Sequence, residues 1–115
     1  MKSLLASVCL VLPTAAFAAG SWTNVSVIAI TAYSAESPYG PNGGAIAVLS
    51  SAHGGTPPGC ATNTTYIAVD TTNNAGMAAL SLLEEAMTQG LHVNIAGTGS
   101  CSIGPTEALS SVSLL

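Results

Sequence analysis

Residues 73–96, NNAGMAALSLLEEAMTQGLHVNIA, decide the fold because they join a helix to a strand at a single glycine. Ala, Leu and Met recur at helical spacing over about 75–89, and Asn73 or Asn74 is placed to cap the N-terminus of the helix. Gly90 then stops the helix. The six residues after it alternate between apolar and polar side chains, as a half-buried strand does. The segment therefore predicts one helix followed directly by a strand.

The apolar surface of this helix is wider than one stripe. At a period of 3.6 residues, the positions expected to face the core are Gly76, Leu80, Leu83 and Met87. Several alanines and Leu82 extend the apolar arc beyond them. We therefore expect the helix to be covered from two directions, with Leu82 and Ala78 at an interface between subunits. An irregular pattern on a helix with one buried face is the alternative.

Outward from this segment, the chain consists of short strands separated by loops. β-Branched and apolar residues predict strands at 25–33, 45–50 and 64–70 before the helix, and at 91–96 and 107–115 after it. The glycine-containing segment 97–105, GTGSCSIGP, is expected to form the loop between the last two strands. The order is β-β-β-α-β-β, which indicates an all-β domain with one helix. It is the order of an OB-like five-stranded Greek-key barrel. An open five-stranded sheet with the helix packed on it fits the same order.

The N-terminus has the three parts of a secretory signal peptide. Lys2 is the positive residue, residues 4–12 are an uncharged apolar run, and Ala16-Phe17-Ala18 gives the small-x-small cleavage pattern. The apolar run is far shorter than the roughly 20 residues that cross a bilayer. We expect residues 1–18 to be cleaved and residues 19–115 to form a single domain that is secreted or periplasmic.

The charge of the chain excludes two classes of partner. Lys2 is the only Lys or Arg in the sequence, and it belongs to the predicted signal peptide. Nucleic-acid binding depends on basic side chains that neutralise phosphates, and attraction to anionic lipid has the same requirement. No segment after residue 18 is long and apolar enough to insert into a membrane. We therefore expect neither nucleic acid nor a membrane as partner.

Two cysteines, Cys60 and Cys101, remain after the signal peptide. Disulfides persist in exported proteins, so we expect these two to be linked. The bridge would close a loop of about 40 residues and contribute roughly 3–4 kcal/mol. A metal pair or a reactive thiol is the alternative, but no further ligand lies near either cysteine. His53 and His92 lie far apart in sequence, so we expect no metal and no cofactor.

The sequence contains no recognisable catalytic constellation, and we do not expect an enzyme. Glu84 and Glu85 are adjacent on the helix, so their side chains point in different directions and cannot act on one substrate. The aromatic residues of the mature chain lie among Ser, Thr and Asn, and they are Trp22, Tyr33, Tyr39 and Tyr66. Aromatic rings beside hydroxyls and amides are compatible with a sugar site.

Three stretches resemble the B subunits of AB5-type toxins of the subtilase-cytotoxin and typhoid-toxin kind. Ser21-Trp22-Thr23 resembles the Glu-Trp-Thr start of those subunits, and residues 26–33, SVIAITAY, resemble their first strand. Residues 83–95, LEEAMTQGLHVNI, resemble their helix and the strand after it. Cys60 precedes the third strand, as one of their disulfide cysteines does. The stretches cover about half of the mature chain.

The resemblance implies OB-fold subunits that form pentamers, bind cell-surface glycans and associate with a toxin A subunit. In that family a serine at the start of the first strand contacts the sugar, and Ser26 matches it by position. The family's Arg in the fourth strand is Asn94 here, and its C-terminal cysteine pair is absent. The function expected is a secreted, non-enzymatic, glycan-binding homo-oligomer. The alternative is a small exported structural or interaction protein without a sugar site.

Overall fold

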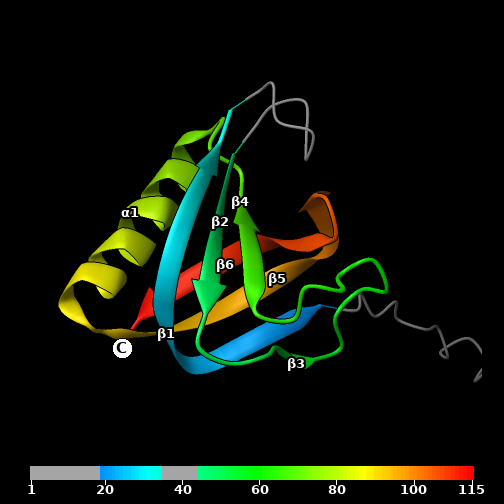
Figure 1. Ribbon diagram of the computed structural model, residues 1–115, viewed down its shortest axis with the longest axis horizontal. Helices are drawn as coiled ribbons and strands as arrows, with labels where there is room; N and C mark the ends of the chain where they lie inside the picture. The colour runs from blue at the N-terminus through cyan, green and yellow to red at the C-terminus, as the bar shows by residue number, and fades with distance from the viewer. Residues whose placement is uncertain (1–18, 35–43) are drawn as a thin grey trace, which may run out of the picture.

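The computed structural model describes residues 19–34 and 44–115, and it is mostly sheet with one helix (Figure 1). The elements are, in chain order, β1 (Gly20–Tyr33), β2 (Gly44–Leu49), β3 (Gly54–Gly55), β4 (Tyr66–Val69), α1 (Asn74–Gln89), β5 (His92–Ile103) and β6 (Thr106–Leu114). This is the order predicted from the sequence, with the two-residue β3 added. The predicted signal peptide, residues 1–18, and Tyr39 lie outside the described residues.

β1 joins the two parts of the sheet because it pairs with three other strands. Its first half pairs antiparallel with β5, its second half with β2, and its N-terminal end with β3. β2 pairs antiparallel with β4, and β6 pairs antiparallel with β5. β4 and β6 are parallel and pair at Ala68 and Ala108. The pairings therefore run in a complete circuit from β1 through β2, β4, β6 and β5 back to β1.

Two strands are longer than the sequence predicted. β1 begins at Gly20 rather than at residue 25, because Ser21 and Trp22 pair with Ala96 and Ile95 of β5. β5 continues to Ile103, so the loop predicted over 97–105 was wrong. That segment still pairs with β6, through several shifts of register. Its glycines resemble a loop in sequence, but the neighbouring strand keeps them in the ladder.

The ends of α1 are capped as the sequence predicted. The Asn73 side chain accepts a hydrogen bond from the Gly76 N–H at 2.7 Å. At the other end Gly90 has φ 67°, a left-handed conformation, and its N–H donates to the Ala86 carbonyl. Each cap satisfies a backbone group that the helix itself leaves without a partner.

The buried stripe of α1 is centred one position away from the predicted one. Ala79, Leu83 and Ala86 are buried, whereas Leu80 and Met87 are partly buried at the side of the core. Gly76 is also only partly buried. Position 76 requires glycine for another reason, because a Cβ there would collide with the Asp70 carbonyl. The alanines lie at the centre because they let the helix approach the strands closely.

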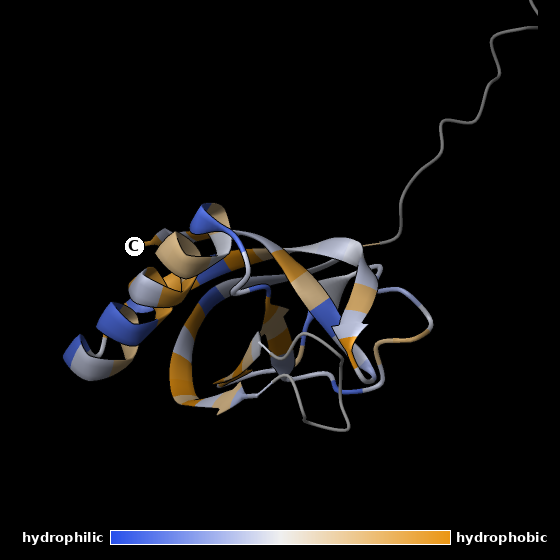
Figure 2. Cartoon of the chain, turned by 90° about the horizontal axis from the view of Figure 1, so that it is seen from above, coloured by the Kyte–Doolittle hydropathy of each residue, from blue (hydrophilic) through white to orange (hydrophobic). Residues whose placement is uncertain are grey.

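The described residues form two hydrophobic clusters, a small one of Ile46, Ala68 and Ile103 and a main core that fills the inside of the strands and continues under α1. Its largest fully buried apolar side chains are Trp22, Leu49, Ile67, Leu83, Val69 and Val93. Figure 2 shows pale or white colour over much of the strands, in keeping with a chain rich in Ser, Thr, Gly and Ala.

Within the described residues, α1 does not have the length and hydropathy of a helix that crosses a bilayer.

The predicted disulfide is present. Cys60, in the loop between β3 and β4, is bonded to Cys101 of β5, with 6.3 Å between their Cα atoms. Cys101 in turn lies opposite Glu107 in the β5–β6 ladder. The bridge therefore ties the loop before β4 to the region where β6 begins.

Candidate functional site

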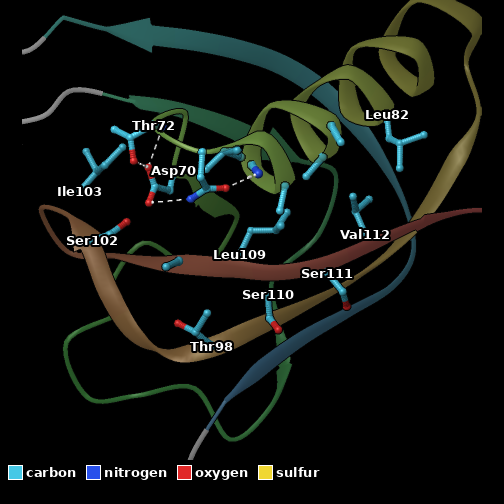
Figure 3. A pocket seen from close by; sticks show the side chains of 17 residues that line it. Asp70, Thr72, Leu82, Thr98, Ser102, Ile103, Leu109, Ser110, Ser111 and Val112 are labelled. Carbon is cyan, nitrogen blue, oxygen red and sulfur yellow. Dashed lines mark hydrogen bonds between the residues drawn. The ribbon is translucent and has the colours of Figure 1, made fainter.

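A groove of about 790 Å³ lies between α1 and β6 (Figure 3). We call it the α1–β6 groove. One wall is the N-terminal half of α1, with Ala75, Ala78 and Leu82, and the other is β6, with Leu109, Ser111 and Val112. Thr98, Ser102 and Ile103 of β5 close one end. The lining is therefore apolar, with scattered hydroxyl groups.

Among the described residues that line the α1–β6 groove, Asp70 is the only charged one, and its side chain already accepts hydrogen bonds. It accepts hydrogen bonds from the N–H of Thr72 at 2.8 Å, the hydroxyl of Thr72 at 2.6 Å and the amide of Asn73 at 3.2 Å. The Thr72 hydroxyl, followed by its N–H, lowers the pKa of Asp70 below the ordinary 3.8. Asp70 thus shapes the turn that leads into α1, and is poorly suited to act as a general acid.

The two residues predicted at a subunit interface both lie on this groove. Leu82 is partly buried and Ala78 is exposed, and Figure 3 shows Leu82 above Val112 of β6. They lie beside the buried stripe of α1 rather than on it, as the width of the apolar arc predicted. Whether another subunit covers them stays a prediction.

Ser26 lies in a second region, an exposed polar patch formed by β1, β5 and the residue after β2. We call this the β1–β5 patch, and its members are Asn24, Ser26, Ser50, His92 and Asn94. Ser26 is paired with His92 in the ladder, so the two side chains lie on the same face. The Ser26 N–H donates to the Ser50 hydroxyl at 2.9 Å, and the Ser50 N–H donates to the Ser26 carbonyl at 3.0 Å.

Asn24 organises the β1–β5 patch. Its φ of 55° is the only positive φ among the described residues other than glycine, and the register of β1 against β5 shifts there. Its N–H donates to the Asn94 side-chain oxygen at 2.8 Å, and its own side-chain oxygen lies 2.7 Å from Nδ1 of His92. Asparagine tolerates the left-handed region better than most residues, and such conformations concentrate at functional sites.

Sequence reasoning missed a third polar region, which is buried. Glu107 is fully buried, and its carboxylate accepts hydrogen bonds from the Gly20 N–H at 3.1 Å and the Gly99 N–H at 2.9 Å. A Cβ at Gly97 would collide with this carboxylate, and one at Gly20 would come within 2.6 Å of it. The signal available in the sequence was the pair of glycines at 97 and 99, which was interpreted as a loop.

Trp22 and His53 lie beside this buried region. Their rings meet edge to face with centroids 5.4 Å apart, and the His53 side chain also contacts the position of Gly20. Trp22 Nε1 and His53 Nε2 are buried polar atoms without a hydrogen-bond partner among the described residues. Since the indole of Trp22 is almost completely buried, it offers no ring face to a ligand.

A small hollow of about 110 Å³ contains the two tyrosines that the structure describes. Tyr33 and Tyr66 line it together with Asn63, Ile46 and Pro105. The Asn63 amide donates to the Thr106 hydroxyl at 3.2 Å, which fixes its orientation. The hollow combines rings with an amide, but it is much smaller than the α1–β6 groove.

No group of three or more His, Cys, Asp or Glu in residues 19–34 and 44–115 is arranged to hold a metal ion. Both cysteines of this part of the chain are used in the disulfide. Comparisons with protein-family models, with curated proteins and with solved structures find no match to this chain.

Proposed function

We propose that this chain is an exported, non-enzymatic binding protein built on an OB-like barrel. The circuit of strand pairings supports the barrel, because a sheet whose pairings return to the first strand has the connectivity of a closed sheet. The position of α1 between β4 and β5 and the parallel contact of β4 with β6 are in keeping with the OB arrangement. The disulfide is in keeping with an oxidising compartment.

The observation that carries a binding function is the β1–β5 patch around Ser26. Five neutral polar side chains from three separate segments lie together there, four of them exposed and Ser26 partly buried. The hydrogen bonds of Asn24 to Asn94 and to His92 hold the side chains in place without using all of their donors and acceptors. A preformed group of hydroxyls and amides matches the hydroxyls of a sugar.

The ligand class follows from the chemistry of this patch. It contains no Lys or Arg, since the sole basic residue of these two types is Lys2. We therefore propose a neutral, hydroxyl-rich glycan, held by hydroxyls, side-chain amides and the imidazole. Neutral hydrogen bonds contribute about 0.5–1.5 kcal/mol each. Single-site affinity is then on the order of millimolar, and several copies on a surface are needed for strong attachment.

The proposed role agrees with the resemblance to toxin B subunits, in which Ser26 matches the sugar-contacting serine. Association with a toxin A subunit is part of the same proposal. The competing function is an exported interaction protein without a sugar site. The wide α1–β6 groove favours that alternative, because its apolar lining suits a protein surface better than a sugar.

A glycan array with purified exported protein tests the proposal. Wild type should bind a set of neutral glycans, and Ser26→Ala should reduce surface binding by at least tenfold when several sites act together. Ser81→Ala is the matched control, because Ser81 is an exposed serine on α1, outside the patch. Equal loss in both variants, or no wild-type signal on any glycan, would reject the glycan site.

Tyr66→Ala serves as a second comparison in the same array. If binding is lost in Tyr66→Ala and retained in Ser26→Ala, the sugar site lies in the tyrosine hollow instead of the β1–β5 patch. Far-ultraviolet circular dichroism of each variant checks that the fold is unchanged.

A further inference from the structure

One side of β6 is left without a strand along most of its length. We call residues 109–114 the open half of β6 and residues 106–108 the closed half. β5 pairs with both halves, whereas β4 reaches β6 only at Ala68 and Ala108. Among the strands that the structure describes, none pairs with the other side of the open half. Alternate N–H and C=O groups of this half therefore face the α1–β6 groove.

α1 does not cover this edge. Proteins often shield a free strand edge with a helix, and α1 lies on that side of β6. The α1–β6 groove nevertheless separates the two elements, and Leu109, Ser110, Ser111 and Val112 all line it. The groove therefore exposes a strand edge on one wall and an apolar helix flank on the other.

The sequence of the open half does not protect it against pairing. Residues 108–115, ALSSVSLL, contain no charged residue and no proline, which are the usual means of blunting an edge. Its small serines are exposed, and Leu115 directly after the strand is 60% exposed. The one disturbance is a shift of register between Ala96 and Gly97, opposite residues 109–111. The edge is thus suited to accept another strand.

We propose that the occupant of the groove is a second copy of this chain, whose β6 pairs antiparallel with the first β6 about a twofold axis near Ser111 and Val112. Such an edge is its own complement, because each copy offers the same uncharged residues and the same free backbone groups. The axis makes the two open halves form one continuous ladder. It also brings the groove flank of α1 in each copy, with Ala78 and Leu82, over the partner strand.

Charge favours this arrangement. Figure 3 shows Leu82 above Val112, with Asp70 and Thr72 toward the other end of the groove, so α1 and β6 run in the same general direction. A twofold axis then makes the two helices antiparallel and keeps the two Asp70 carboxylates at opposite ends. The acidic pair in the second half of each α1 lies toward the partner's first turn, which has no acidic residue. Negative charge near a helix N-terminus is stabilising.

The area buried between the two copies determines how strong the dimer is expected to be. Stable dimers bury on the order of 1,600 Å² in total. Six paired residues in each copy do not bury this area alone, so the helix flanks and Leu115 must contribute to the interface as well. We expect a reversible dimer that forms at micromolar concentrations or above. The proposal goes beyond the glycan site and does not depend on it, since the β1–β5 patch lies on other strands.

Sedimentation equilibrium of the exported protein over a wide range of concentration tests the proposal. The expected result is a monomer–dimer equilibrium. Ser111→Lys should weaken dimerisation at least tenfold, because it places two like charges near the axis. Ser81→Lys is the matched control, since Ser81 is an exposed serine on α1 that does not line the groove. Leu82→Glu, on the opposite wall, should also weaken dimerisation.

Hydrogen exchange gives a second measurement on the unmodified protein. Backbone amides of residues 109–114 should become better protected as concentration rises, while those of β1 and β2 stay unchanged. A monomer at every concentration overturns the proposal, and leaves the groove to a strand from another protein. A pentamer also overturns it, because a twofold edge contact closes at two copies. So does an equal effect of Ser111→Lys and Ser81→Lys.

Discussion

The two halves of β6 differ in how deeply their polar residues are buried. The closed half, residues 106–108, contains the only acidic residue of the strand, and this residue, Glu107, is fully buried. The open half, residues 109–114, consists of Leu, Val and Ser, and its side chains are partly or fully exposed. Its serines are exposed, whereas Leu109, Val112 and Leu114 are half-buried and pack against the core.

Strand pairing accounts for the difference between the two halves. The closed half is flanked by β5 on one side and by β4 on the other. Its carboxylate accepts hydrogen bonds from backbone N–H groups of β1 and of β5. The open half has one neighbouring strand, and its other edge faces the α1–β6 groove.

The substitution expected to destabilise the closed half most is Glu107→Ala. The substitution leaves the Gly20 and Gly99 N–H groups buried without an acceptor and opens a cavity. Each unsatisfied buried donor costs about 1–3 kcal/mol. We expect the free energy of unfolding to fall by about 4 kcal/mol, measured by urea denaturation with circular dichroism.

Glu107→Gln is the matched control. It keeps the volume and one acceptor oxygen, so the loss should be about half as large. A loss below about 1 kcal/mol in Glu107→Ala would show that the carboxylate does not hold the closed half.

Removal of the disulfide should weaken the same region, to a slightly smaller extent. Cys60 and Cys101 are 41 residues apart in sequence, and Cys101 lies opposite Glu107. Loop closure of this length contributes about 3–4 kcal/mol. The double variant Cys60→Ser/Cys101→Ser should lose that amount in urea denaturation. If its unfolding curve overlaps that of wild type, the closed half does not depend on the bridge.

The start of α1 lines the same groove as the open half, and the stability of the helix can be tested there. Asn73→Ala removes the acceptor that Gly76 uses, and loss of such a cap costs about 1 kcal/mol. The midpoint of thermal unfolding should fall by several degrees. Asn74→Ala is the control, because Asn74 is the neighbouring asparagine and does not act as the cap. Equal effects of the two variants would contradict the assignment of the cap.

The smallest effect is a pH dependence at the end of the groove. The hydroxyl and N–H of Thr72 lower the pKa of Asp70 in the folded state. The stabilisation is therefore complete above the ordinary value of 3.8 and is lost as the pH falls through the lower, folded value. Thr72→Val should flatten the decline of stability below that pH. A steeper decline in Thr72→Val would contradict this origin.

The sequence contained enough information for the parts of the fold that depend on neighbours in the chain. The cap at Asn73, the stop at Gly90 and the order of the elements follow from local patterns. The disulfide followed because only two cysteines, Cys60 and Cys101, come after the predicted signal peptide. Each of these predictions needed only a short stretch of sequence or the number of cysteines.

The buried carboxylate and the polar patch could not be derived in that way. Glu107 is separated by 87 residues from the Gly20 N–H that it binds, and no pattern in the sequence relates the two. The neighbours of Ser26 depend on the change of register at Asn24. Registers arise from contacts between distant strands, so single-sequence patterns do not determine them.

The hydrogen bond between Glu107 and the Gly20 N–H also determines when the domain can complete its folding. It joins the first residue of β1 to the last strand, so nearly the whole domain must be available before it forms. Contacts between such distant residues slow folding, because a long loop must close first. When a chain leaves the ribosome or a translocation channel N-terminus first, the residues of β1 therefore emerge long before Glu107 does. Until then the nascent chain depends on chaperones, or on remaining extended, to avoid aggregation.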